Sequence, residues 1–197
     1  MITLTLWFPA GRYHATPWGR HVNEGVPEWP PSPGRLLQAL VDTWHRKRPT
    51  WSESRVLPLL KALASELPRF SLPPARASHT RSYLHQNKKD PTDKKLVFDA
   101  FVALDRAHVA VMRWDGVSLS ATQEKDLATL CDQLNYLGRS ESWVQVRVGG
   151  DPPPGGYVWN AWPVVSGATA AGFEAIPVAC MESAREYVQH LWPGKEK

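Results

Sequence analysis

Apolar side chains recur at every second position at the start of the chain, which is the pattern of a strand that buries one face. In residues 2–8 every even-numbered position is apolar: Ile2, Leu4, Leu6 and Phe8. A period of two puts these four side chains on the same side of a strand. Stretches rich in β-branched and aromatic residues predict three more strands, at residues 96–104, 109–114 and 143–148.

Two helices are predicted from apolar stripes that have clear start and stop residues. Ser32 and Pro33 provide an N-cap and a first-turn proline, and Pro49 ends this first helix. Ser120 caps a later helix, and Gly138 is placed to end it.

An additional helix follows the first one. It is predicted to start near Ser52 or Ser54 and to end at Glu66. Pro58 favours the later start, because proline is tolerated only in the first turn of a helix.

The order of these elements predicts the fold. Without the additional helix and a basic segment at residues 75–95, the order is strand, helix, strand, strand, helix, strand. This is the α+β ferredoxin-like (RNA-recognition-type) βαββαβ plan, in which a turn at Asp105 and Arg106 would join the second and third strands. Right-handed crossovers would place both helices on one face of a four-stranded antiparallel sheet and leave the other face free.

We expect this domain to occupy residues 1–150, with the basic segment as a thumb-like insertion. Residues 151–197 would form a C-terminal extension or the start of a linker, which contains Trp159, Trp162 and a final helix at residues 182–191.

The net charge of +4 is unevenly distributed along the 197 residues. Residues 76–95 contain six Lys or Arg and two Asp, whereas residues 96–197 contain eight basic and twelve acidic residues. A cationic first half favours a polyanionic partner, and a solvated surface of uneven charge is the alternative. No apolar stretch approaches the roughly 20 residues that span a bilayer. The first residues also lack the basic region of a signal peptide. We therefore expect a cytoplasmic protein without a membrane partner.

The sequence lacks the motifs of several enzyme classes. Cys131 and Cys180 cannot form a disulfide scaffold or a four-ligand zinc site alone. No pair of histidines has the helical spacing of a zinc-protease motif, and no phosphate-binding loop or nucleophile elbow occurs. We therefore expect no metal, no cofactor, and neither nucleotide hydrolysis nor esterase chemistry.

The segment that leaves the first strand brings together a cation, an aromatic ring and an imidazole. Arg12, Tyr13 and His14 are consecutive, and Arg20 and His21 follow in the same loop. In the recognition of single-stranded RNA, arginine contacts phosphate and tyrosine stacks on a base. His14 could act as a general acid or base, because its free pKa lies near 6.5. The alternative is a loop histidine that is hydrogen-bonded to the backbone.

The basic segment interleaves cations with aromatic rings. Its members are Arg76, His79, Arg81, Tyr83, His85, Lys88 and Lys89. In an extended strand the odd positions from 79 to 85 would share one side. A positively charged hairpin or arm that grips a nucleic-acid backbone is one interpretation, and a solvated surface loop is the other.

Four stretches, residues 8–25, 29–40, 96–103 and 136–144, resemble a single known family. The first, FPAGRYHATPWGRHVNEG, is long and idiosyncratic. The family is the fused Cas-five/Cas-six subunit of type I-G (formerly I-U) CRISPR systems, and the similarity spans about residues 2–150.

The resemblance implies that the chain is the Cas-five-like half of this family. Such a domain holds the 5′ handle of the CRISPR RNA in an antiviral, Cascade-like ribonucleoprotein. The implied partners are the CRISPR RNA, a Cas-seven-type backbone subunit and the large subunit, with target DNA met indirectly. The Cas-six-like endoribonuclease half is absent from these residues and would be a further partner, attached or separate. No cofactor is implied.

The resemblance also assigns roles by position. It makes Arg12, Tyr13 and His14 the best contacts for the handle, followed by Arg20 and His21. The place where Cas-five proteins extend a thumb-like hairpin is matched by His79, Arg81 and Tyr83, together with Lys88 and Lys89. Arg139, at the turn after the third predicted helix, could bind phosphate or brace the sheet.

Two other functions stay open beside a non-catalytic RNA-binding subunit, which we favour. A metal-independent endoribonuclease would use His14 or His79 to assist attack by a 2′-hydroxyl, and Tyr83 would position that hydroxyl. A protein-only assembly module of the complex would have no affinity for RNA.

Overall fold

The computed structural model describes residues 1–17, 25–85, 94–150 and 156–161 of the chain. Within these residues helices and antiparallel strands are mixed along the chain, which confirms the predicted α+β class. The elements are β1 (Ile2–Trp7), β2 (Arg12–Tyr13), α1 (Pro33–Lys47), α2 (Glu53–Ala64), β3 (Arg69–Ser71), β4 (Ala75–His85), β5 (Lys94–Leu104), β6 (Ala110–Trp114), α3 (Ala121–Asp132) and β7 (Gln145–Val148).

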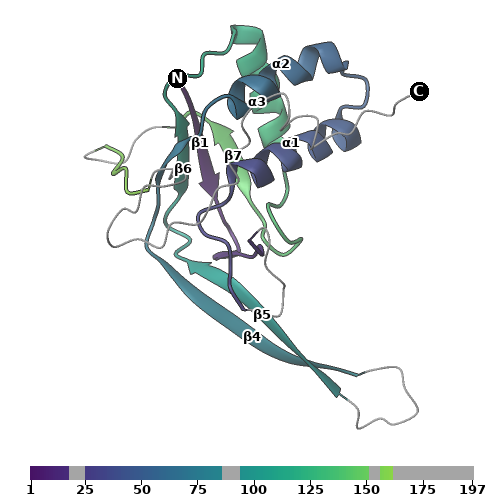
Figure 1. Ribbon diagram of the computed structural model, residues 1–197, viewed down its shortest axis with the longest axis vertical. Coiled ribbons are helices and arrows are strands. Elements are labelled where there is room, and N and C mark those ends of the chain that lie inside the picture. Colours follow the sequence, from purple (N-terminus) through teal and green to yellow (C-terminus); the bar gives the residue numbers. More distant parts are fainter. Residues whose placement is uncertain (18–24, 86–93, 151–155, 162–197) are drawn as a thin grey trace.

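Four strands form one antiparallel sheet in the order β3-β6-β1-β7 (Figure 1). Leu4 lies opposite Met112, and Leu6 lies opposite Val146. These side chains are buried in one core cluster together with residues of all three helices. The alternation at the start of the chain therefore predicts the buried face of β1 correctly, because one side of the strand is in contact with the helices (Figure 1).

The helices begin at the residues that the sequence marks as caps. Ser32 and Ser120 accept hydrogen bonds from backbone N–H groups in the first turns of α1 and α3. Helix α3 ends at Asp132, however, so the prediction that Gly138 ends it is wrong. Gly138 has a φ of +87° and lies in a separate turn, where a Cβ would meet the His14 carbonyl at 2.5 Å.

The later of the two predicted starts for α2 is wrong, because the helix begins at Glu53 with Ser52 as its cap. Pro58 lies inside the helix, where it removes one backbone hydrogen bond. A bidentate ion pair from Arg55 to Asp126 of α3, at 2.8 and 2.6 Å, helps to hold this helix in place.

A second sheet, in the order β2-β5-β4, contains the basic segment. Strands β4 and β5 pair along their whole length, from Ala75 opposite Leu104 to His85 opposite Lys94. Figure 1 shows these two strands extending from the rest of the molecule as a long hairpin, which we call the arm. Residues 75–85 therefore form a strand of a hairpin rather than a loop over the described residues. That this hairpin grips a nucleic acid stays a prediction.

The position of β5 corrects the predicted strand order. The sequence places residues 96–104 in the four-stranded sheet, joined to the next strand by a turn at Asp105 and Arg106. Instead, β5 and β6 belong to different sheets, and the place next to β6 is taken by β3. The short strand β3 contributes one buried side chain, Phe70. Three residues are too few for alternation to be recognised, and this explains the error.

The face of the four-stranded sheet opposite the helices is not entirely free. Ala161 forms an isolated bridge with Phe70, and the Trp159 ring lies against Arg69 and Arg113 on this face. Trp162 and the predicted final helix at residues 182–191 lie outside the described residues. Among the described helices, none is long and apolar enough to cross a membrane.

Candidate nucleic-acid interface

One face of the arm carries three of the side chains that the sequence singles out. His79, Arg81 and Tyr83 share this face, and the residues opposite them on β5 are Ala100, Phe98 and Leu96. All three are exposed, and Tyr83 retains 65% of its accessible surface. The expected common side of positions 79, 81 and 83 is therefore confirmed by the strand geometry.

Phe98 contacts two of the side chains of this face, His79 and Arg81. The His79 ring stacks on Phe98 with centroids 4.5 Å apart, and the Arg81 guanidinium lies 5.9 Å from the same ring. Sequence reasoning missed Phe98, because a nearly continuous apolar stretch predicts a strand without identifying which residues support a surface site. Its position directly opposite Arg81 in the register is what identifies it.

The other face of the arm brings further arginines together at its base. Arg12 and Arg76 both lie opposite Ala103, from the two neighbouring strands, so their side chains share one side of the sheet. Both are exposed, and the Arg12 guanidinium lies 5.4 Å from the Phe101 ring. Arg139 approaches the same strand through Asp99, with Nη1 and Oδ1 3.4 Å apart. This contact braces the turn after α3 against β5, while 39% of the Arg139 side chain stays accessible.

Tyr13 does not join this surface. Its ring is completely buried, and its hydroxyl donates a 2.5 Å hydrogen bond to Oε1 of Glu28. Burial and the negative charge of Glu28 raise the pKa of Tyr13 well above its ordinary value, so the phenol stays protonated and acts as a donor. The expectation that Tyr13 stacks on a base is wrong for this structure, because no base can reach a ring without accessible surface.

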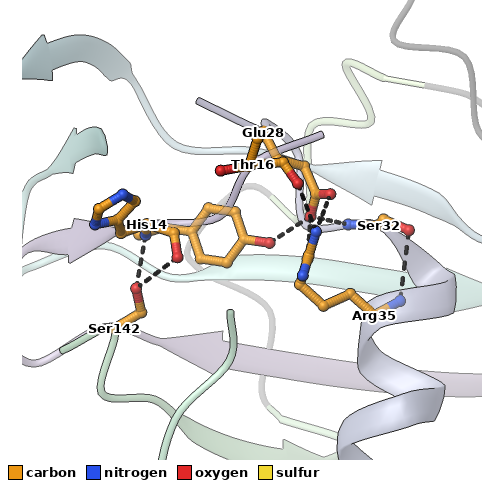
Figure 2. A network of polar contacts seen from close by, with 7 residues as sticks. His14, Thr16, Glu28, Ser32, Arg35 and Ser142 are labelled. Carbon is orange, nitrogen blue, oxygen red and sulfur yellow. Dashed lines mark hydrogen bonds and ion pairs between the residues drawn. The ribbon is translucent and has the colours of Figure 1, made fainter. Parts of the chain in front are cut away.

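Glu28 is the centre of a buried polar network. It connects α1 to the segment between β1 and α1, residues 12–17 and 25–31 of the described chain, which we call the opening loop. Arg35 donates to both of its carboxylate oxygens, each at 2.9 Å, and the backbone N–H of Ser32 donates to Oε1 at 3.0 Å. A further hydrogen bond runs from Arg35 to the carbonyl of Thr16 (Figure 2). A buried carboxylate needs such a complete set of donors, because leaving its charge unpaired would cost several kcal/mol.

His14 is likewise a structural residue here. Only 3% of it is accessible, and Nδ1 lies 2.7 Å from Oε1 of Glu141. Its backbone N–H donates to the Ser142 hydroxyl, and its carbonyl accepts from the Arg139 N–H (Figure 2 shows the Ser142 contacts). His14 is therefore a buried loop histidine, but its ring pairs with the Glu141 carboxylate and not with the backbone as the alternative expected. The expectation that His14 contacts RNA is wrong for this structure.

The three candidate catalytic side chains are not brought together. His14 is buried beside Glu141, whereas His79 and Tyr83 are exposed on the arm. Four residues of extended strand separate His79 from Tyr83, which is about 13 Å of rise. Among the described residues no group of three His, Cys, Asp or Glu side chains could hold a metal ion.

Arg20, His21, Lys88 and Lys89 lie outside the described residues, so their expected roles stay predictions.

No protein-family model matches the chain, and no curated protein matches it either.

Proposed function

We propose that the chain is the subunit that binds the 5′ handle of the CRISPR RNA in a type I-G, Cascade-like surveillance complex. The proposal rests on the family resemblance of the sequence together with a cationic arm that is accessible from both sides. Its expected partners are the CRISPR RNA, a Cas-seven-type backbone subunit, the large subunit and a Cas-six-like endoribonuclease half or subunit. Target DNA would be met indirectly, and the complex would act in the cytoplasm.

The strand order supports the RNA-recognition-type assignment. Along the chain the four strands of this sheet follow one another as β1, β3, β6 and β7. In the sheet order β3-β6-β1-β7, β1 and β6 are central, and β3 and β7 form the edges. This is the order expected when two right-handed β-α-β units interlock as a ferredoxin-like domain. The arm is then an insertion between the second and third strands, and β2 is a short addition after the first.

The observation that carries the proposal is the exposure of cations along the arm. Arg76 and Arg81 make no ion pair with any residue in the described part of the chain, while most other arginines of the body are paired with carboxylates. Unpaired guanidinium groups beside accessible aromatic rings can contact phosphates while the rings stack on bases. A two-stranded arm also presents both of its faces to an extended strand of RNA.

The test replaces two arm cations and compares them with two cations of the helix layer. Arg76→Ala with Arg81→Ala should weaken binding of a short, labelled single-stranded RNA about tenfold at low salt. It should also reduce the log–log salt slope by about 0.7 for each phosphate that the variant no longer neutralises. Arg46→Ala with Lys47→Ala, both exposed on α1, removes the same charge away from the arm and should change both quantities little.

Equal losses in the two double variants would contradict the proposal, because net charge rather than the arm would then control binding. Binding by the wild-type chain that does not depend on salt would contradict it as well. Cleavage of the RNA in the presence of EDTA would favour the endoribonuclease alternative instead.

A further inference from the structure

Three arginines lie on the face of the four-stranded sheet that points away from the helices. Arg113 of β6 lies opposite Arg69 of β3, and Arg147 of β7 lies opposite Thr5 of β1. Their strand neighbours Phe70, Met112 and Val146 are buried in the helix-facing core, so the arginines point to the other side. This face therefore carries positive charge on three of its four strands.

Arg69 and Arg113 form a fixed pair that we call the arginine platform. Asp115 forms ion pairs with both guanidinium groups. Its Oδ1 accepts hydrogen bonds from Nε of Arg113 at 2.7 Å and from Nη2 of Arg69 at 3.2 Å, and its Oδ2 lies 2.8 Å from Nε of Arg69. A single carboxylate thus orients two neighbouring guanidinium groups and leaves the platform with one net positive charge. Planar guanidinium groups held in this way are suited to stack on an aromatic ring.

The ring found on the arginine platform belongs to the chain itself. The Trp159 centroid lies 4.6 Å from the guanidinium carbon of Arg69 and 4.4 Å from that of Arg113. The backbone next to Trp159 is attached to the edge of the sheet rather than to its face. Asn160 exchanges side-chain hydrogen bonds with the N–H and the carbonyl of Leu72, at 2.8 and 2.9 Å, and Ala161 bridges Phe70.

We propose that the arginine platform is a second RNA site, which takes an unpaired nucleobase, and that Trp159 occupies it until RNA displaces the indole. This inference rests on the proposed RNA-binding function. An indole and a nucleobase both present a flat π face to a guanidinium group. RNA also brings phosphates to Arg69, Arg113 and Arg147, which the neutral indole cannot do. Because Trp159 is tethered at the sheet edge, it competes at a high effective concentration.

The test removes the competing ring from the full chain and measures affinity for a short, labelled single-stranded RNA. Trp159→Ala should bind the RNA about fivefold more tightly. In this variant the RNA no longer has to displace the indole from the guanidinium groups of the arginine platform. Adding Arg69→Ala and Arg113→Ala to Trp159→Ala should remove this gain. Thermal unfolding of each variant confirms that the measurement is made on folded protein.

The matched control is Trp51→Ala. Trp51 also has two guanidinium groups against its ring, those of Arg55 at 4.0 Å and Arg48 at 5.8 Å, but it lies between α1 and α2. This variant should gain no affinity for RNA.

An unchanged or weaker affinity of Trp159→Ala overturns the inference, and so does a gain that persists without Arg69 and Arg113. These results leave the proposed function intact as long as binding still depends on Arg76 and Arg81 of the arm. If neither wild type nor Trp159→Ala binds RNA at any salt concentration, the proposed function fails and the inference fails with it.

Discussion

The opening loop and the arm contain the same kinds of side chain but use them in opposite ways. Arg12, Tyr13 and His14 supply one cation, one phenol and one imidazole, and His79, Arg81 and Tyr83 supply the same three types. In the loop the phenol and the imidazole are buried, whereas in the arm all three side chains are exposed.

The difference lies in the acidic partners. Tyr13 and His14 each have a carboxylate within hydrogen-bond distance, Glu28 and Glu141, and these polar groups are satisfied inside the protein. No described carboxylate pairs with Arg81, and Phe98 supplies only a ring beneath it. A cation or phenol that is already paired with an acid contributes to stability, and one that is left exposed is available to a ligand.

The largest effect should come from breaking the network of the opening loop. Glu28→Gln removes a buried charge that faces Arg35, and it should lower the free energy of unfolding by about 3 kcal/mol. Urea denaturation followed by circular dichroism measures this loss. Arg81→Ala in the arm should stay within about 0.5 kcal/mol of wild type. Similar losses in the two variants would show that the contrast between the regions is false.

Substitution of Tyr13 and of Tyr83 should have opposite consequences for stability and for RNA affinity. Tyr13→Phe keeps the buried ring and removes its hydrogen bond to Glu28, so unfolding should cost about 2 kcal/mol less. Its affinity for RNA should not change. Tyr83→Ala should leave stability unchanged and weaken RNA binding about tenfold, because one stacking surface is removed. Denaturation and RNA-binding measurements on both variants test this. A loss of RNA affinity in Tyr13→Phe, or a loss of stability in Tyr83→Ala, would contradict the prediction.

The smallest effect concerns acid sensitivity. Partial burial raises the pKa of Glu141, but hydrogen bonds from its own backbone N–H and from His14 outweigh this and leave the pKa below its ordinary value. The contribution of Glu141 to stability is therefore present above its unfolded pKa of about 4.3 and is lost as pH falls through the lower folded pKa. Glu141→Gln should show a shallower loss of stability below about pH 4, whereas Arg81→Ala should keep the wild-type slope. Denaturation curves at a series of acidic pH values measure both slopes, and identical slopes in wild type and Glu141→Gln would contradict the assignment.

Local sequence signals determined much of the fold without reference to distant residues. The alternation of Leu4 and Leu6 fixed the buried face of the first strand, and the caps Ser32 and Ser120 fixed the starts of two helices. For the basic segment the sequence left an extended hairpin and a solvated loop as alternatives. These signals are local because a strand or a helix start depends on side chains a few positions apart.

Tertiary structure alone decided which strand enters which sheet and which polar side chains are buried. The short strand β3 gains its place by pairing with β6, some forty residues away in sequence. Tyr13 is buried beside Glu28, which also pairs with Arg35, and the Trp159 ring packs on Arg69 and Arg113, which lie far from it in sequence. Burial of a polar group depends on partners that are distant in sequence, and no local pattern records where those partners meet.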